Sequence, residues 1–309
     1  MMHRESQIVR AMVEPRMRSG SAVSPRTIWL LGKVAVLEWI DDNALRLSAA
    51  MSYYITFSLA PLLLIVIAVA GLAMGNDSAR VAIFGQINQL IGPTGAEAID
   101  HILESASKPK TGFVAGVTGV VMLLLGATGV VGQLQDALNT IWQVESKPSG
   151  GVRRIIRRRI ASFAMILGVS FLLLISLVVS TAVSALSAYW DGPTETVVEG
   201  LHLIVSTVVI TVLFALMYKV LPDVKLKWRD VWIGGLVTAI LFTIGKTLTG
   251  LYLAKSSVAS SYGAAGSLVI ILIWVYYSSA IFLLGAEFTQ VYTRYREVKI
   301  APKTESPTR

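Results

Sequence analysis

Residues 265–290 read AGSLVIILIWVYYSSAIFLLGAEFTQ, an apolar run with a single charged residue near its end. A helix needs about 20 mostly apolar residues to cross the hydrocarbon core of a bilayer, and this run is longer than that. Five further stretches of similar length and composition precede it, at 49–74, 112–133, 162–188, 201–221 and 231–254. The sequence therefore predicts an all-α, polytopic membrane protein with six transmembrane helices.

The composition agrees with a chain that lies largely in lipid. Hydrophobic residues make up 54% of the sequence, charged residues make up 15%, and the mean hydropathy is +0.66, which is above the range of ordinary soluble proteins. The first 26 residues are polar and basic without an apolar core, so we expect the first span to act as an uncleaved insertion signal. The absence of cysteine excludes disulfides, thiolate catalysis and cysteine metal sites.

The distribution of Lys and Arg between the loops predicts the orientation. The two termini and the loops after spans two and four carry twenty-two of these residues, and the alternate loops carry four. Cytoplasmic loops are enriched in Lys and Arg, so both termini should face the cytoplasm. The run Arg153–Arg159 lacks the interleaved aromatic residues of a nucleic-acid-binding module. We therefore expect this basic face to attract anionic lipid headgroups and not nucleic acid.

The chain divides into a disordered basic tail at 1–26, one membrane domain at 27–296 and a polar tail at 297–309. An amphipathic pattern from Thr27 to Leu47 predicts an interfacial helix that leads into the first span. Two helical faces within 75–111, separated by Gly92-Pro93, predict an amphipathic helical hairpin over the outer mouth, in the first extracytoplasmic loop.

Hydroxyl-bearing residues recur at helical spacing in several spans, so each set shares one face of its helix. Such residues either let neighbouring helices pack closely or converge on a hydrated cavity that could pass a solute. The sequence leaves both interpretations open. The cavity interpretation names Ser52, Thr56, Ser180, Ser184, Thr207, Thr211, Thr238, Thr249, Tyr276 and Tyr277 as candidate residues.

Lys246 is the most unusual residue of the spans, because it lies about eight residues from the outer end of the fifth. A lysine near the middle of a span costs about 2–3 kcal/mol on insertion scales. Its side chain either extends to the outer headgroups or faces the bundle interior, where it could attract an anionic group or a proton. In the second case Lys246 belongs to the candidate cavity.

A second polar cluster is predicted near the cytoplasmic ends of the helices. Asp136 and Asn139 follow the second span, Arg46 precedes the first, and Glu287 lies about four residues inside the predicted end of the sixth. A carboxylate at that depth needs a partner, and Arg46 is the candidate. The four residues form either a structural polar lock between helix ends or a cytoplasmic gate.

Several short motifs occur in order along the membrane domain. They are Leu47-Ser-Ala-Ala-Met-Ser-Tyr-Tyr54, Leu59-Ala-Pro-Leu-Leu63, Leu221-Pro222, Trp228-Arg229-Asp230-Val231, Tyr262-Gly-Ala-Ala-Gly-Ser267, Trp274-Val-Tyr-Tyr277 and Leu284-Gly-Ala-Glu-Phe288. Together they resemble the YihY/BrkB family of bacterial inner-membrane proteins. The resemblance implies a multi-pass protein of the cytoplasmic (inner) membrane, with proposed roles in transport or export and in envelope integrity.

An older label calls some members of that family ribonucleases, but the residues predict no enzyme. Ribonuclease chemistry needs paired histidines or carboxylates around a metal. The three histidines are scattered at His3, His101 and His202, and the sequence contains no phosphate-binding loop, nucleophile elbow or HExxH pattern. We expect no catalytic residues, no metal and no cofactor.

We expect a permease or exporter of an unidentified small solute, with a polar cavity formed by spans one, three, four, five and six. Because the sequence has no P-loop, the chain alone should not use ATP. A non-transporting envelope scaffold and a lipid-handling protein are the alternatives. The expected partners are membrane lipids and the solute, and a homo-oligomer is compatible with the sequence.

Overall fold

The computed structural model describes residues 25–91, 93–107, 130–144, 195–255 and 266–300. The predicted third span, most of the second, Ser180, Ser184 and nearly all of both tails lie outside the described residues. Within these ranges every regular element is a helix. The helices are α2 (Pro25–Asp41), α3 (Ala44–Met74), α4 (Asn76–Ile91), α5 (Pro93–Ser107), α8 (Glu195–Val220), α9 (Trp228–Lys255) and α11 (Gly266–Ile300), together with a helical segment at 130–141.

Among the described residues, three helices contain segments that are long and apolar enough to cross a membrane. These segments are Leu203–Val220 in α8, Trp228–Tyr252 in α9 and Gly266–Arg296 in α11, and they correspond to the predicted spans 201–221, 231–254 and 265–290. Helix α3 covers the whole of the predicted first span. The all-helical class and the membrane nature of the chain are therefore confirmed.

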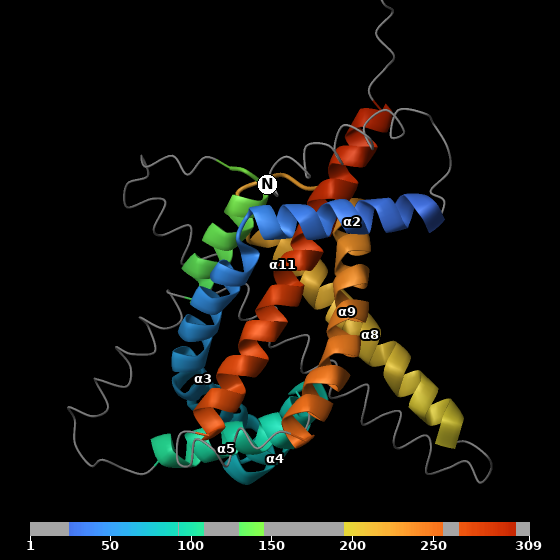
Figure 1. The fold of residues 1–309 in the computed structure, drawn as a ribbon. Coiled ribbons are helices and arrows are strands. Elements are labelled where there is room, and N and C mark those ends of the chain that lie inside the picture. The colour runs from blue at the N-terminus through green and yellow to red at the C-terminus, as the bar shows by residue number, and fades with distance from the viewer. Residues whose placement is uncertain (1–24, 92, 108–129, 145–194, 256–265, 301–309) are drawn as a thin grey trace, which may run out of the picture.

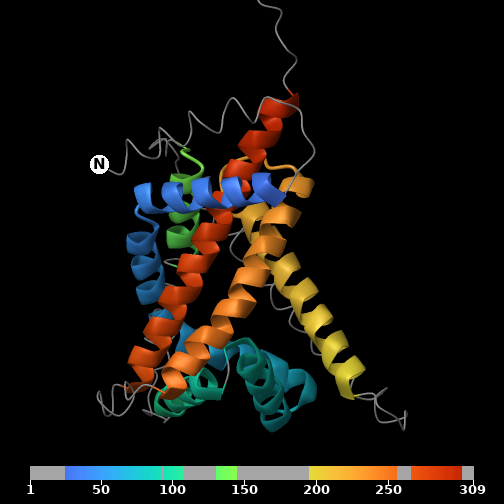
Figure 2. The same cartoon turned by 45° about the vertical axis from the view of Figure 1, so that its right-hand side comes forward.

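Helices α3, α8, α9 and α11 run between two ends of the molecule, and shorter helices lie across each end (Figures 1 and 2). Helix α2 crosses α11 at one end, where Leu31 and Val34 pack against Phe288 and Tyr292. At the other end, Ala98 of α5 belongs to an apolar cluster with the first residues of α11. Each end of α11 is thus covered by a helix that lies across it.

The amphipathic segment predicted at 27–47 is divided between two helices. Helix α2 ends at Asp41, and Asn43 adopts a left-handed conformation with φ 54° before α3 begins at Ala44. Asparagine tolerates this conformation because its short side chain bonds locally, here by donation from Nδ2 to the Asp41 carbonyl at 3.2 Å. We call residues 41–44 the α2–α3 elbow. The predicted hairpin within 75–111 is present as α4 and α5, which an Arg80–Asp100 ion pair of 2.5 Å joins.

Helix α11 extends well past the predicted end of its span at residue 290. It has 35 residues, or about 50 Å at about 1.5 Å per residue, whereas the hydrocarbon core is about 30 Å thick. The helix continues to Ile300 because α2 covers the apolar face of its last turns, including Val291 and Tyr295. Glu287 is therefore more than three turns from the helix end, which corrects the sequence estimate.

Helices α8 and α9 cross at very short range beside Gly235. A Cβ atom at this position would lie 2.7 Å from the carbonyl oxygen of Thr211 and 3.0 Å from the amide nitrogen of Ala215, both main-chain atoms of α8. Main-chain atoms of a helix cannot move aside without moving the helix. The crossing therefore requires glycine at position 235.

Gly235→Ala should lower the free energy of unfolding by about 1–3 kcal/mol, because the added methyl group forces α8 and α9 apart. Gly250→Ala, in the same helix, is the matched control: no described atom lies within 4 Å of a Cβ there, and alanine favours a helix by about 1 kcal/mol over glycine. Thermal unfolding of both purified variants in detergent micelles measures the difference. Equal unfolding temperatures would contradict the close crossing.

Candidate functional site

A buried hydroxyl group joins the three spanning helices α8, α9 and α11. Tyr218 of α8 is fully buried, and its hydroxyl lies 2.7 Å from the Phe282 carbonyl of α11 and 2.9 Å from Thr238 Oγ1 of α9. The Thr238 hydroxyl also lies 2.7 Å from its own helix carbonyl at Gly234. The protons of the two hydroxyl groups are thus shared among three short contacts to protein oxygen atoms. We call Tyr218, Thr238 and Phe282 the three-helix seal.

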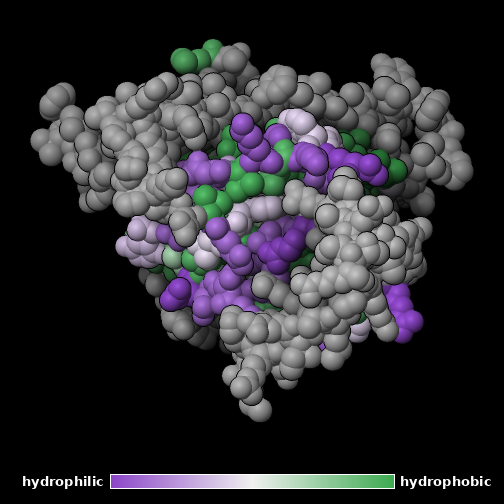
Figure 3. All heavy atoms as spheres, turned by 90° about the horizontal axis from the view of Figure 1, so that it is seen from above, coloured by the Kyte–Doolittle hydropathy of each residue, from purple (hydrophilic) through white to green (hydrophobic). Residues whose placement is uncertain are grey.

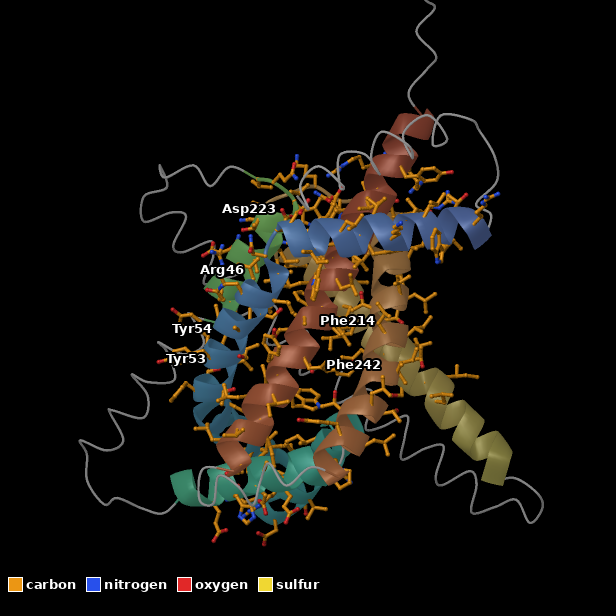
Figure 4. The ribbon with its side chains drawn as sticks, in the orientation of Figure 1. Arg46, Tyr53, Tyr54, Phe214, Asp223 and Phe242 are labelled. Carbon is orange, nitrogen blue, oxygen red and sulfur yellow. The ribbon has the colours of Figure 1, made fainter. Side chains whose placement is uncertain are left out.

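Aromatic rings fill the space around this seal. The ring of Phe214 lies 5.7 Å from that of Phe242, and the ring of Phe242 lies 6.0 Å from that of Trp274. Figure 4 shows Phe214 and Phe242 in the middle of the bundle. Thr211 is buried beside them and donates to the carbonyl of Thr207, the helical residue one turn before it. On this side of α11 the structure favours the packing interpretation for Thr211 and Thr238.

The hydroxyl stripe of α3 behaves differently. Ser52 donates to the carbonyl of Ala49 at 2.8 Å and is satisfied within its own helix. Thr56, one turn further on, is only 4% exposed, and its Oγ1 has no hydrogen-bond partner among the described residues. A buried hydroxyl without a partner carries an unfavourable free energy of about 1–3 kcal/mol, so Thr56 marks a place for a water molecule or a solute group.

The remaining cavity candidates in the described part of the chain differ in how far they are buried. Thr207 is half-buried and donates to the carbonyl of Leu203. Thr249 is buried, whereas Lys246, Tyr276 and Tyr277 are half-buried. The Tyr277 hydroxyl lies over Gly245, where a side chain would overlap it, so this phenol closes part of the α9–α11 crossing.

A second set of polar groups is buried where residues 130–144 meet α11. Asn139 Nδ2 donates to an Asp223 carboxylate oxygen at 3.2 Å and its Oδ1 accepts from the Asp223 amide at 2.9 Å. Gln290 Nε2 of α11 donates to the Ile141 carbonyl at 2.6 Å. Within the described ranges, Gln290 Oε1 and the indole nitrogen of Trp142 are buried without a hydrogen-bond partner.

Glu287 is the most isolated of these groups. Its side chain is fully buried, and neither carboxyl oxygen has a hydrogen-bond partner in the parts of the chain that the structure describes. The expected Arg46–Glu287 pair is not formed, because Arg46 is exposed and lies with Tyr53 and Tyr54 on the side of α3 away from α11 (Figure 4). Asp136 is exposed as well. The predicted four-residue cluster is therefore not assembled as one group.

Helix α2 supplies the neighbours of Glu287 that the sequence did not predict. Trp39 Nε1 donates to the Ala280 carbonyl of α11 at 3.1 Å, and Glu38 pairs with Arg294 of α11 at 3.3 Å. Glu287 lies between these two contacts along α11, and Asp42 of the α2–α3 elbow is its nearest carboxyl neighbour. Hydrophilic side chains gather on the face of the molecule that α2 crosses (Figure 3).

The residues that sequence reasoning missed lie on two helical faces. Gln290 and Arg294 were missed; they follow the predicted Glu287 at intervals of three and four, which places them on the same face of α11. Glu38 and Asp42 have the same relation at the end of the amphipathic segment. This spacing could have predicted that each set of polar residues shares one face of its helix. We call Glu38, Asp42, Trp142, Glu287, Gln290 and Arg294 the polar junction.

Comparisons with known proteins agree with this architecture. The family model "Virulence factor BrkB" matches residues 35–308. A UPF0761 membrane protein of Enterobacter sp. (strain 638) and the UPF0761 membrane protein YihY of Salmonella typhimurium are each 30% identical over 73% of this chain and 74% of their own length. A UPF0761 membrane protein of Cronobacter sakazakii is 29% identical over 92% of this chain and 96% of its own. No solved structure matches. The chain belongs to the YihY/BrkB family of membrane proteins.

Proposed function

We propose that the protein is a permease or exporter of a small solute in the bacterial inner membrane. Its pathway follows the side of the bundle bounded by α3, residues 130–144 and α11. The observation that carries this proposal is Glu287, a fully buried carboxyl group without a hydrogen-bond partner among the described residues. Ionisable groups inside membrane bundles typically mark the paths of ions, protons or substrates.

The distribution of unsatisfied polar atoms around α11 supports the position of the pathway. The side that faces α8 and α9 is closed by the three-helix seal and its aromatic rings. Among the described residues, the unsatisfied atoms of Thr56, Trp142, Glu287 and Gln290 lie in α3, α11 and the segment 130–144, and the hydroxyl of Ser278, two turns before Gly285 on α11, is unsatisfied as well. Buried polar groups are nearly always paired in native proteins, so the unsatisfied atoms of Thr56, Trp142 and Gln290 are places where water or a solute group would bind. The cavity of this proposal is therefore smaller than the sequence suggested.

A non-transporting scaffold is the second candidate, and the three-helix seal favours it. A bundle whose hydroxyl groups all bond to protein atoms has no hydrated path, and Thr211 and Thr238 fit that description. The two candidates differ in what they require of Thr56: a permease requires water beside it, and a scaffold requires dry packing.

Cysteine accessibility separates these candidates without knowledge of the solute. Thr56→Cys and Thr211→Cys place single thiols at two positions that are each 4% exposed, in a chain that has no other cysteine. In proteoliposomes, we expect a small water-soluble methanethiosulfonate to modify Thr56→Cys at least tenfold faster than Thr211→Cys, because only the first thiol borders a hydrated path. Mass spectrometry of the intact protein measures the rates.

Equal, slow rates at the two positions would favour the scaffold over the permease. Osmotic swelling of the same proteoliposomes in isotonic potassium chloride or a neutral sugar provides the direct comparison. Proteoliposomes with the wild-type protein should swell faster than empty liposomes in at least one medium. After methanethiosulfonate modification, proteoliposomes with Thr56→Cys should swell no faster than empty liposomes. Swelling no faster than that of empty liposomes in every medium would contradict the permease.

We further propose the topology that the basic residues predict: six spans, with α2 and the loop between α8 and α9 in the cytoplasm and the α4–α5 hairpin outside. The excess of Lys and Arg at the termini supports it. Glu97 of α5 and Lys225 of the α8–α9 loop are both exposed. Helix α5 and the α8–α9 loop lie at opposite ends of the bundle (Figure 2).

In intact cells, a membrane-impermeant maleimide should label Glu97→Cys and leave Lys225→Cys unlabelled, because only α5 faces the periplasm. After permeabilisation both variants should be labelled equally, which controls for the intrinsic accessibility of the two thiols. Gel-shift detection of the labelled protein measures both. The reverse pattern in intact cells would invert the topology, and labelling of both variants would contradict the placement of the two segments on opposite sides.

A further inference from the structure

The carboxyl group of Glu287 lies among more negative than positive groups. Asp42 and Glu38 approach it from the end of α2, and Arg294 approaches it from α11. The Arg294 guanidinium already pairs with Glu38 at 3.3 Å, and its side chain is 43% exposed. From α3 and from residues 130–144 the nearest candidates, Arg46 and Asp136, are exposed. Among the described residues, the basic group that acts on Glu287 is thus one that Glu38 already shares.

The contacts on either side of Glu287 hold Asp42 close to it. Trp39 of α2 bonds to the Ala280 carbonyl, and Glu38 bonds to Arg294, so the last turn of α2 is fixed against α11 before and after position 287. The left-handed Asn43 then turns the chain into α3 and keeps Asp42 at this contact. Two carboxylates in contact are both acceptors, and neither can donate a hydrogen bond to the other unless one carries a proton.

We infer that Glu287 and Asp42 hold one proton between them, as a buried proton-binding pair at the α2–α3 elbow. The O–H of one carboxyl group donates to an oxygen of the other, which supplies Glu287 with the partner it lacks and removes one negative charge from the junction. Asp42 is half-buried, so the proton enters and leaves through its exposed edge. Release of the proton leaves two like charges in contact and pushes the elbow away from α11.

The binding of the proton is independent of any transported solute. Its further role, as the switch that opens or closes the path beside α11, rests on the function proposed above. Proton binding is therefore tested on the protein without solute or flux, so that a failure of the permease proposal and a failure of this one give different results.

Infrared spectroscopy of the full-length protein in lipid bilayers at neutral pH detects the pair directly. The carbonyl stretch of a protonated carboxyl group should be present in the wild type and should shift to lower frequency in heavy water. It should fall as the pH is raised. Glu287→Gln should abolish this band, because it removes the buried carboxyl group, and Asp42→Asn should shift its frequency, because it replaces the carboxyl partner of the protonated group with an amide. Asp77→Asn is the control, since Asp77 is exposed in the first turn of α4, and it should leave the band unchanged.

Glu287→Gln differs little from the wild type in size, and its unfolding temperature verifies that the variant is folded. An unchanged band in both folded variants would overturn the inference. Absence of the band from the wild type would also overturn it. If sodium or potassium then raised the unfolding temperature, a bound cation would occupy the place of the proton. Presence of the band together with no solute flux would uphold the proton pair and reject the permease.

Discussion

The hydroxyl group of Tyr218 is the contact on which the arrangement of the membrane helices depends. It lies in the centre of the bundle and reaches α9 through Thr238 and α11 through the Phe282 carbonyl. Gly234 and Gly285 have no side chains that would hold the helices apart, and a Cβ at either would overlap a threonine hydroxyl from the facing helix. Lipid provides no hydrophobic force between helices, so close packing and interhelical hydrogen bonds must hold them together. This seal therefore fixes the position of α11.

Helix α11 in turn organises the remaining elements, because α2, α3, α5 and α9 all pack on it. One side of the helix is closed by the three-helix seal, while another carries Glu287 and Gln290, whose oxygens lack a hydrogen-bond partner among the described residues. The closed side makes it costly for α11 to move relative to α9. The elements that can respond to a proton or a solute are then the α2–α3 elbow and the segment 130–144, which place Asp42 and the Ile141 carbonyl beside the polar groups of α11. The proposed transport therefore depends on a rigid contact of α11 with α8 and α9 and on the buried carboxyl group of Glu287 on another side of α11.

The positions of the described spans could be predicted from sequence because long apolar runs allow few alternatives in a bilayer. The length of α11 could not, since its last turns are stabilised by α2, which packs against Tyr292 and Tyr295. The hydroxyl stripes were identified, but periodicity places a threonine on a face without saying what that face meets. The same limit applies to Glu287: its contact with Asp42 depends on the left-handed turn at Asn43, which no spacing rule would predict.

A double-mutant cycle tests most directly whether the α8–α9–α11 interface is sealed without water. The free energies of unfolding of the wild type, Tyr218→Phe, Thr238→Val and the double variant would be measured in detergent micelles. A direct hydrogen bond between buried hydroxyl groups of membrane helices predicts a coupling energy of about 0.6 to 1.7 kcal/mol. Strictly additive effects would contradict the account, because they would mean that the two hydroxyl groups do not interact and that the helices are not joined there.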